Sequence, residues 1–228
     1  MNEFIVCIPA AGCGRRMGGS SPKQYLPLRG RTVLERTLDV FDLMEKCRAV
    51  FLAVDDVQYA QSLIDATAWS MPIHIVSGGV RRQDSVARAL ERCDDNHAIV
   101  LVHDAARPCV TPAQVSAVVE AVCVHGAALL ALPARDTMKR VHAGVVRETL
   151  DRSIIWHAQT PQAAHAGLLR LAFAEAQRRG IEATDDVSLL EAMDVPVHVV
   201  EGSPENIKIT TPEDLSVAEA ILALQGRV

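Results

Sequence analysis

The sequence predicts an α/β fold in which helices flank a mostly parallel sheet, with a β-arm protruding from it. Up to Pro133, short apolar runs alternate with longer segments of helical periodicity, a pattern typical of βαβ units. Beyond Pro133, a charged stretch with a glycine turn interrupts this alternation. Hydrophobic residues make up 49% of the 228-residue chain and charged residues 22%, as in a globular domain.

The apolar runs have the length of buried strands, and the periodic segments between them have the length of helices. The predicted strands of this half are Phe4–Pro9, Ala49–Val54, Ile73–Val76, Ala98–His103 and Ala128–Leu132. The predicted helices are Thr32–Glu45, Val57–Thr67, Gln83–Cys93 and Pro112–His125. Because open α/β sheets bind ligands beyond the carboxyl ends of their strands, we expect the functional residues just after these strands.

The stretch after Pro133 predicts the arm. Met138–His142 and Val145–Leu150 flank Ala143-Gly144 and carry many charges but few large apolar side chains. This pattern is expected of a hairpin that stands away from the core. We place the arm at about 134–155 within a single domain, 1–228, because the sequence contains no internal repeat or linker.

Helical patterns resume after the arm. The predicted helices are His165–Arg179 and Asp185–Met193, followed by a strand at Val197–Val200. The last helix begins at Thr211, with an N-capping hydroxyl, Pro212 at the first helical position and acids in the first turn. The second half therefore returns to the α/β pattern of the first.

The composition argues against several classes of protein. A net charge of −5 disfavours a binder of nucleic acid, and 4% aromatic residues leave little to stack on single strands. No run of about 18 apolar residues predicts a membrane span, and we expect no signal peptide. The six cysteines form no C-x-x-C pair, which excludes zinc ribbons and leaves a reducing cytoplasm as the expected location.

Positive charge is concentrated near the N-terminus. The segment Phe4–Leu34 holds no acid, but it carries Arg15, Arg16, Lys23, Arg29 and Arg31. The chain has 19 Arg and only four Lys, at 23, 46, 139 and 208, so each lysine stands out. An acidic protein thus has a cationic segment suited to one small polyanion.

Two glycine-containing segments follow predicted strands. The first, Pro9–Gly18, lets backbone N–H groups approach a phosphate, yet it matches neither the dinucleotide fingerprint nor the P-loop. With Lys23 downstream it suits a triphosphate; the alternative is an ordinary glycine turn. The second, Gly78–Val86, could hold a base or ribose; the alternative is a loop that simply starts a helix.

An acid follows the predicted strand Ala98–His103. Asp104 lies where phosphate-transfer sheets often place a magnesium ligand, and one carboxylate with substrate phosphates suffices for Mg²⁺. Arg107 could bind a second anion. The alternatives are a surface ion pair of little value between these two residues, and a packed, hydrogen-bonded His103 rather than a metal ligand.

The polar segments of the second half are individually weak signals. They are Asp136–Arg140, Asp151-Arg152, Trp156–Gln162, Ala183–Asp186 and Asn206–Thr210. Lys208 lies between two isoleucines, so on a strand it would point away from both, which plain amphipathicity also explains. Three of the four lysines nevertheless lie in the polar segments described here.

Taken in order, the motifs resemble those of one enzyme family. The chain contains Pro-Ala-Ala-Gly-x-Gly-Arg-Arg-Met, Pro-Lys-Gln-Tyr, Asp-Ser-Val, His-Asp-Ala-Ala-Arg-Pro, Arg-Asp-Thr-Met-Lys, Asp-Arg, Thr-Pro-Gln, Thr-Asp-Asp and Asn-Ile-Lys-Ile-Thr. This set resembles the 2-C-methyl-D-erythritol 4-phosphate cytidylyltransferases of the non-mevalonate isoprenoid pathway, from Pro9 to Asp214. The resemblance implies a Rossmann-like nucleotidyltransferase fold and a homodimer built by the arm.

The resemblance also implies a reaction. CTP and 2-C-methyl-D-erythritol 4-phosphate would give 4-diphosphocytidyl-2-C-methyl-D-erythritol and pyrophosphate, with Mg²⁺ as cofactor on Asp104. Arg16 and Lys23 would stabilise the transition state. The residues implied to bind the nucleotide are Pro9, Ala10, Ala11, Gly12, Gly14, Arg15, Gly79, Ser85 and Ala105.

The acceptor phosphate is implied to meet a second set of residues. Arg152 and Lys208 would hold it for attack. The further substrate-binding residues are Arg107, Thr137, Thr160 and Thr184. Thr137 and Arg152 are implied to reach the partner subunit's site from the arm. The acceptor is a phosphate monoester, already anionic at neutral pH, so this chemistry needs no general base.

Three other functions remain as alternatives. A ribitol 5-phosphate cytidylyltransferase would share the first loop and the reaction type, although Ala105-Ala106 and Arg135–Met138 favour the methylerythritol enzyme. A sugar-nucleotide pyrophosphorylase would use another nucleoside triphosphate. A nucleotide-sensing module on the same fold would bind CTP without releasing pyrophosphate, but it would not need Arg16, Lys23 and Asp104 together.

Overall fold

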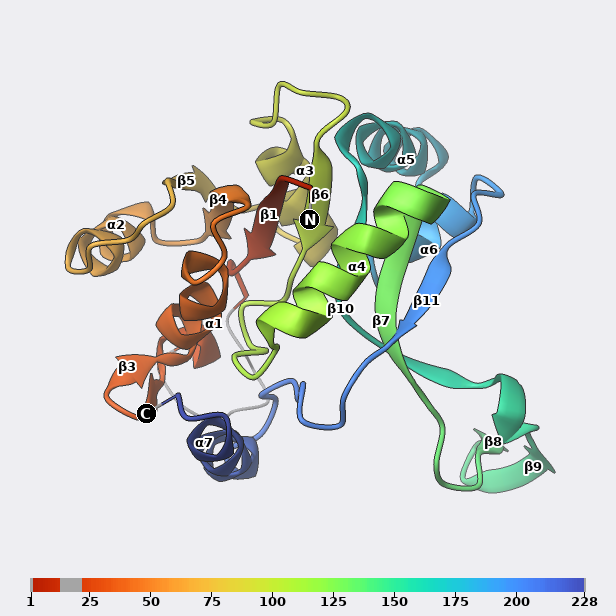
Figure 1. The fold of residues 1–228 in the computed structure, drawn as a ribbon. Coiled ribbons are helices and arrows are strands. Elements are labelled where there is room, and N and C mark those ends of the chain that lie inside the picture. The colour runs from red at the N-terminus through yellow and green to blue at the C-terminus, as the bar shows by residue number, and fades with distance from the viewer. Residues whose placement is uncertain (1, 13–21, 228) are drawn as a thin grey trace.

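A seven-stranded sheet separates two layers of helices in the computed structural model, which describes residues 2–12 and 22–227 (Figure 1). In spatial order the strands are β11 (His198–Glu201), β7 (Ala127–Pro133), β10 (Trp156–His165), β6 (Ile99–Val102), β1 (Phe4–Pro9), β4 (Cys47–Val54) and β5 (Ile73–Ser77). The predicted fold class, a mostly parallel sheet flanked by helices, is confirmed.

One strand of the sheet runs against the others. β10 is antiparallel to both β6 and β7, whereas the remaining pairs are parallel. The sequence pattern does not predict this strand, because the segment contains Pro161 and few β-branched residues. The register against β7 shifts between Ala158 and Gln162, which accommodates a proline inside a buried ladder.

Apolar side chains of β1 alternate between the two helical layers, as the two-residue period of a strand requires. Phe4, Val6 and Ile8 pack with α1 (Val33–Asp42), α2 (Val57–Asp65) and α4 (Pro112–His125). Ile5 and Cys7 pack in the opposite layer. That layer contains α3 (Arg82–Leu90), α5 (Ala166–Arg179) and α6 (Val187–Glu191). Burial on both faces explains why the strands read as continuous apolar runs.

Most predicted elements are present, with different ends. α4 has the predicted bounds, and α1 begins after Thr32, whose hydroxyl accepts a hydrogen bond from the Glu35 backbone N–H in a capping box. α6 is shorter than predicted. The structure also contains short elements that the sequence pattern does not predict, namely η2 (Lys23–Tyr25), β2 (Pro27–Leu28), β3 (Arg31–Thr32) and η3 (Arg152–Ile154).

The last helix, α7 (Glu213–Leu224), closes one end of the sheet. Its residues Ala218, Ile221 and Leu222 pack in a separate apolar cluster that includes Ala106 and Ile209. The Asp214 carboxylate accepts hydrogen bonds from the backbone N–H groups of residues 210 and 211. This packing holds the segment before α7, which carries Lys208, against the loop after β6.

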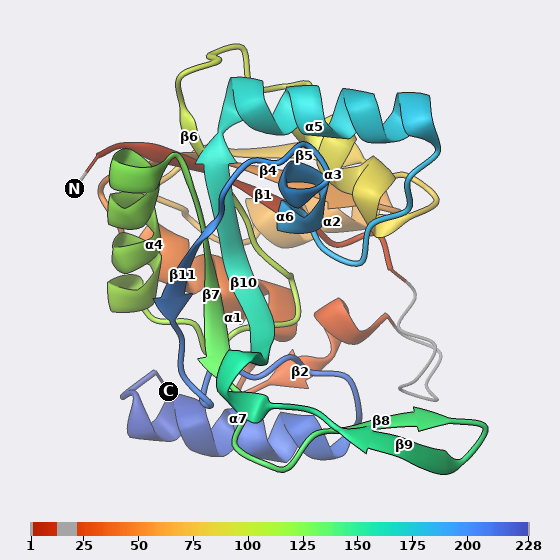
Figure 2. The same cartoon turned by 90° about the vertical axis from the view of Figure 1, so that its right-hand side faces the viewer.

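The predicted arm is present as a hairpin of β8 (Lys139–His142) and β9 (Val145–Thr149), which stands away from the body in Figure 2. Its turn residues Ala143 and Gly144 both have positive φ, as a two-residue hairpin turn requires. Every residue of both strands is exposed.

In the described part of the chain, no helix is long and apolar enough to span a membrane.

Candidate active site

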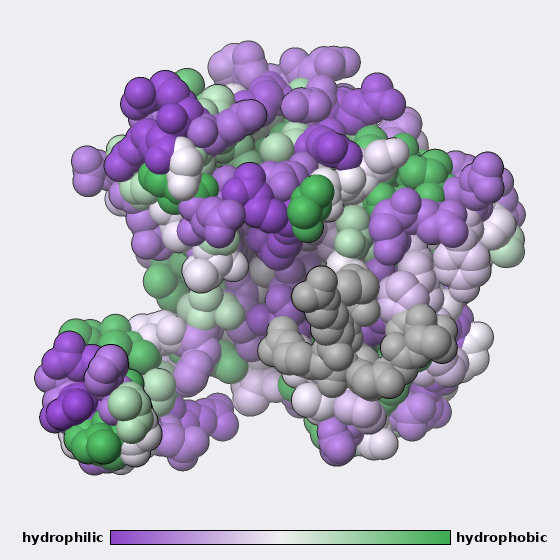
Figure 3. Space-filling model, turned by 180° about the vertical axis from the view of Figure 1, so that it is seen from behind, coloured by the Kyte–Doolittle hydropathy of each residue, from purple (hydrophilic) through white to green (hydrophobic). Residues whose placement is uncertain are grey.

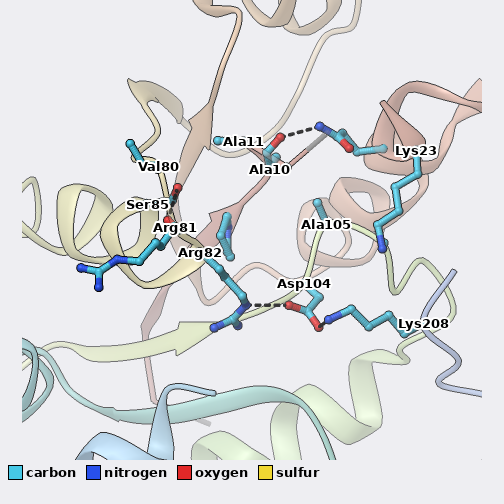
Figure 4. Close-up of a pocket in the computed structure, with 14 residues that line it drawn as sticks. Ala10, Ala11, Lys23, Val80, Arg81, Arg82, Ser85, Asp104, Ala105 and Lys208 are labelled. Carbon is cyan, nitrogen blue, oxygen red and sulfur yellow. Dashed lines mark hydrogen bonds and ion pairs between the residues drawn. The ribbon is translucent and has the colours of Figure 1, made fainter. Parts of the chain in front are cut away.

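Polar loops from both halves of the chain meet in one pocket at the carboxyl ends of β1 and β6 (Figure 4). Its lining comprises Pro9, Ala10, Ala11, Gly12, Lys23, Gln24, Val80, Arg81, Arg82, Ser85, Asp104, Ala105, Ala106 and Lys208. The structure therefore brings together most of the predicted nucleotide-binding residues with Lys23, Asp104 and Lys208. Gly14, Arg15 and Arg16 lie outside the described residues.

Hydrogen bonds tie the loop after β1 to the segments on either side of it. The Gln24 side-chain amide donates to the Ala10 carbonyl over 2.6 Å, and the Ala10 N–H donates to the Ala53 carbonyl. Lys23 Nζ donates to the Ile209 carbonyl over 2.8 Å. Lys23, from the N-terminal half, is thereby held beside the segment that carries Lys208.

Glycines allow the loop before α3 to pack against the loop after β1. A Cβ on Gly78 would lie 2.2 Å from Ala11 Cβ, and one on Gly79 would lie 2.2 Å from Asp84 Cβ. Neither spacing is possible for a larger residue. The Gly79 N–H donates to Ser85 Oγ over 3.0 Å. The predicted nucleotide-binding residues Gly79 and Ser85 are thus fixed to each other, with Ser85 in the pocket lining and Gly79 next to the lining residue Val80.

Asp104 is the anionic centre of the site. Its side chain, only 9% exposed, faces Arg82 Nε at 3.1 Å, Lys208 Nζ at 2.8 Å and Arg107 Nε at 3.5 Å. Burial alone would raise the pKa of Asp104, but Arg82, Lys208 and Arg107 together hold that pKa well below its usual range. The alternative of a mere surface pair with Arg107 is wrong, because both partners are buried.

Arg82 is a pocket-lining residue that the sequence pattern does not reveal. It lies within the segment Gly78–Val86, but a chain with 19 arginines gives no reason to single one out. The neighbouring Arg81 is an exposed residue paired with Asp84 and Glu182. Arg82 instead reaches Asp104 and Asp186, residues 22 and 104 positions away. No local pattern signals contacts of that range.

Two predicted substrate residues lie beneath the pocket rather than in its lining. Arg107 is 9% exposed and donates through Nη1 to the Asn206 carbonyl over 2.7 Å. Thr160 is 4% exposed, and its Oγ1 accepts a hydrogen bond from the Asp104 N–H over 3.1 Å. Both residues support Asp104 or the segment of Lys208, so they shape the site from below.

His103 completes this buried chain of hydrogen bonds. Its Nε2 lies 3.1 Å from the Arg107 carbonyl, and its Nδ1 lies 3.1 Å from Thr160 Oγ1. The carbonyl can only accept, so Nε2 carries the proton and Nδ1 accepts from the Thr160 hydroxyl. The packed, hydrogen-bonded role weighed for His103 is the one the structure shows.

The neutral His103 predicts a pH-dependent stability. Burial lowers its pKa to about 4, whereas an unfolded histidine titrates near about 6.5. As pH falls, the unfolded chain takes up the proton first, so this stability is present above the unfolded pKa and lost toward the folded one. We expect the free energy of unfolding to fall by about 2 kcal/mol from this group between about pH 7.5 and about pH 5. Urea denaturation at both pH values measures it.

The matched variant is His103→Gln, which has no titrating ring. It should lose less stability over the same pH interval than the wild-type chain. An equal loss in the two proteins would contradict the assignment of a buried neutral histidine.

The remaining predicted residues lie away from this pocket. Thr184 lines a second hollow with Asp185 and Asp186, on the other side of Arg82. Thr137 and Arg152 are exposed at the base of the arm, where Arg152 Nη1 donates to the Arg135 carbonyl over 2.6 Å. The described chain does not bring these two residues into the lining of its own pocket.

The chain matches known proteins over nearly its whole length. The matching family model is described as IspD: 2-C-methyl-D-erythritol 4-phosphate cytidylyltransferase and covers residues 4–224. The cytidylyltransferase of that name from Syntrophotalea carbinolica is 44% identical over 228 residues, with 98% of each chain covered. The one from Bacillus velezensis is 43% identical and covers 98% of this chain and 97% of its own.

Solved structures give the same result. The crystal structure of 2-C-methyl-D-erythritol 4-phosphate cytidylyltransferase from Thermus thermophilus matches with a TM-score of 0.80 at 38% identity, covering 97% of this chain and 99% of that one. The Francisella tularensis structure of the same name matches with a TM-score of 0.83 at 36% identity, covering 97% and 100%. Sequence and fold therefore point to the same group of proteins.

Proposed function

The chain belongs to the 2-C-methyl-D-erythritol 4-phosphate cytidylyltransferase family, and from this premise we propose that its pocket binds CTP and presents it to the acceptor phosphate. The family makes it a nucleotidyltransferase, in agreement with the sequence prediction. The reaction joins CTP and 2-C-methyl-D-erythritol 4-phosphate into 4-diphosphocytidyl-2-C-methyl-D-erythritol and releases pyrophosphate. The observation that carries the proposal is the convergence of Lys23, Asp104 and Lys208 from three distant segments on one pocket.

The two walls of the pocket suit the two ends of a nucleotide. The small residues after β1 leave backbone close to a ligand, and Lys23 points into the pocket beside them (Figure 4). Val80, which follows the two glycines, and Ser85 of α3 line the opposite wall. We place the cytosine against the side that Val80 and Ser85 line, and the triphosphate along Ala10, Ala11 and Gly12, toward Lys23.

The chemistry is the displacement of pyrophosphate by a phosphate monoester. One oxygen of the acceptor phosphate forms a bond to the α-phosphorus of CTP, and the bond from that phosphorus to the bridging oxygen breaks, with its electron pair leaving on pyrophosphate. The acceptor's second pKa is about 6, so it attacks as an anion and no general base is needed. Positioning and charge stabilisation supply most of the rate.

The residues of this chain divide that work. Lys23 and Arg16 would offset the charge on the triphosphate and on the leaving pyrophosphate. Lys208 and Arg152 would hold the attacking phosphate in line with the α-phosphorus. Lys208 is 37% exposed and paired with Asp104, so it can exchange that partner for a substrate oxygen at the pocket surface.

Asp104 suits a magnesium ion only together with the triphosphate. The described residues contain no group of three His, Cys, Asp or Glu side chains able to hold a metal ion, and both Asp104 oxygens face cations. Mg²⁺ commonly binds through one carboxylate, substrate phosphates and waters, and Asp104 is ionised at the pocket. We propose that Asp104 holds Mg²⁺ with CTP, where the ion would offset phosphate charge.

A pyrophosphate-release assay tests the reaction. CTP with 2-C-methyl-D-erythritol 4-phosphate should release pyrophosphate in the presence of Mg²⁺, and CTP with D-ribitol 5-phosphate should release little. ATP, GTP and UTP serve as the nucleotide controls. Equal or faster turnover with D-ribitol 5-phosphate would show that ribitol phosphate is the preferred acceptor. CTP binding without any pyrophosphate release would instead favour the alternative of a nucleotide-sensing module.

We also propose that the arm joins two copies of the chain, each lending Thr137 and Arg152 to the other's pocket. Hydrophobic and hydrophilic patches lie together on the exposed arm (Figure 3), where Val141, Val145 and Val146 are each more than half exposed. Valines this exposed on a thin hairpin favour a partner surface that covers them. A two-fold dimer would then complete both pockets reciprocally.

Mixed dimers test this sharing. Co-expressed Lys23→Ala and Arg152→Ala chains should recover activity, because one pocket of each mixed dimer then has both wild-type residues. We expect about a quarter of wild-type activity from equal, random pairing of the two chains in a two-fold dimer. Activity no greater than the sum of the two separate variants would contradict a shared pocket.

The proposed location is the cytoplasm. Cys7, Cys47, Cys93 and Cys109 are free and buried, and Cys123 is free and exposed. Free thiols fit a reducing compartment.

A further inference from the structure

One guanidinium joins two buried carboxylates at the edge of the pocket. Arg82, the first residue of α3, donates through Nε to Asp104 Oδ1 over 3.1 Å. Its Nη1 and Nη2 donate to Asp186 Oδ1 and Oδ2 over 2.9 and 2.7 Å. Asp104 lines the pocket, whereas Asp186 does not. The guanidinium therefore connects the centre of the site to a point outside it.

Asp186 is an anchored partner. It is 2% exposed at the start of α6, and its backbone N–H donates to Gln162 Oε1 over 2.9 Å. Gln162 belongs to β10, which is hydrogen-bonded to β6, the strand that leads into Asp104. Asp186 is thus held by the same sheet that positions the site.

Burying the Asp186 carboxylate costs desolvation free energy. Burial raises the pKa of Asp186, and Asp104 and Asp185 raise it further, against the lowering effect of Arg82. A buried ion pair is often no more stabilising than apolar residues of the same volume. Among the described residues, Arg82 is the one cation in ion-pair contact with Asp186. The pair therefore calls for a role beyond packing.

That role follows from how the Asp104 oxygens are shared. Arg82 takes Oδ1, while Lys208 and Arg107 face Oδ2. Figure 4 shows Arg82 and Lys208 approaching the carboxylate from opposite sides. Because the hydrogen bond from the anchored Arg82 fixes Oδ1, the Asp104 carboxylate cannot rotate freely. Its Oδ2 therefore keeps facing Lys208 and the pocket.

We propose that Arg82, anchored by Asp186, is a positioning residue that orients the Asp104 carboxylate toward the CTP phosphates and their magnesium ion. The inference rests on the proposed function. The two-pronged contact with Asp186 needs the planar fork of arginine, because a lysine offers a single charged nitrogen and no matching geometry. Arg82→Lys keeps the charge and loses the fork, and Asp186→Asn removes the charge that anchors the fork.

The test measures CTP binding by calorimetry with and without Mg²⁺ and with no acceptor present, alongside pyrophosphate release. Mg²⁺ should lower the Kd for CTP in the wild-type chain. In Arg82→Lys and in Asp186→Asn, we expect the ratio of the Kd without Mg²⁺ to the Kd with Mg²⁺ to be smaller by roughly 10-fold or more, the scale on which residues that position a metal ligand act. In Asp186→Asn, whose side chain does not line the pocket, CTP affinity without Mg²⁺ should stay within about twofold of wild type. kcat should fall, and the Mg²⁺ concentration for half-maximal rate should rise.

Matched controls separate positioning from general damage. Arg92→Lys, at an exposed arginine just beyond α3, and Asp65→Asn, at an exposed aspartate at the end of α2, should leave both readouts at wild-type values. Thermal unfolding of each variant reports whether it is folded. Asp186→Asn leaves no unpaired buried carboxylate, so it keeps the test usable if Arg82→Lys fails to fold.

The double variant decides whether the two residues act as one unit. If Asp186 acts only through Arg82, adding Asp186→Asn to Arg82→Lys should change the Mg²⁺ effect little further. Wild-type Mg²⁺ dependence in folded single variants, or fully additive effects in the double variant, would overturn the proposal. A wild-type chain that binds CTP with Mg²⁺ but releases no pyrophosphate would instead refute the proposed reaction while leaving the binding test intact.

Discussion

Lys23→Ala is expected to lower kcat of the cytidylyltransferase by at least about 100-fold, the scale of losing one key electrostatic donor. Lys23 lies in η2, which the hydrogen bond from Gln24 to Ala10 ties to the loop after β1. Its ammonium is held by the Ile209 carbonyl at the side of the pocket where we place the triphosphate. A cation fixed before the reaction needs no reorganisation as charge moves onto the leaving pyrophosphate.

The matched control is Lys46→Ala. Lys46 is exposed in the turn before β4 and outside the pocket, so its removal should leave kcat unchanged. Steady-state pyrophosphate release at saturating CTP and acceptor compares the two variants. Near-wild-type kcat in Lys23→Ala would remove Lys23 from the catalytic machinery.

Asp104→Asn should affect both activity and stability. Replacing the carboxylate with an amide leaves Arg82, Lys208 and Arg107 without the negative charge that brings them together. We expect kcat/KM to fall by at least about 100-fold and the free energy of unfolding to fall by up to about 3 kcal/mol, because Lys208 and the buried Arg107 lose their anionic partner. Pyrophosphate release and urea denaturation measure the two effects.

Asp55→Asn is the matched control, because Asp55 also follows a strand of the sheet. Asp55 directly follows β4, as Asp104 follows the end of β6, but it is exposed and does not line the pocket. Its substitution should leave both measurements close to wild type. If Asp104→Asn were equally harmless, the site would have no anionic centre and the proposed magnesium position would be wrong.

Lys23 and Lys208 stand out in the sequence because lysine is scarce in this chain. Both line the pocket, and their catalytic roles stay predictions. Arg82 carried no such mark among 19 arginines. Asp186 was likewise indistinguishable from Asp185, although only Asp186 meets a guanidinium in the described chain. Residue type and spacing therefore indicate which loops line the pocket, but not which of two adjacent side chains turns inward.

The strand β10 shows the same limit at the level of the fold. Its alanines, glutamines and single proline lack strand propensity, and its burial between β6 and β7 comes from the neighbours that cover it. In this position Thr160 Oγ1 accepts a hydrogen bond from the Asp104 N–H, and Gln162 Oε1 accepts one from the Asp186 N–H. A strand that the sequence did not predict thus supports the site it did predict.

The sequence by itself determined the family, the α/β class, the arm and the loops that hold the pocket, because apolar periodicity, glycines and caps act within a few neighbouring residues. The tertiary structure decided which charges meet. Asp104 lies 104 positions from Lys208 and 22 from Arg82, and their contact depends on strand order and on the packing of α6 and α7. Such contacts form only when the sheet is assembled, since burial of an ionised carboxylate requires all its partners at once.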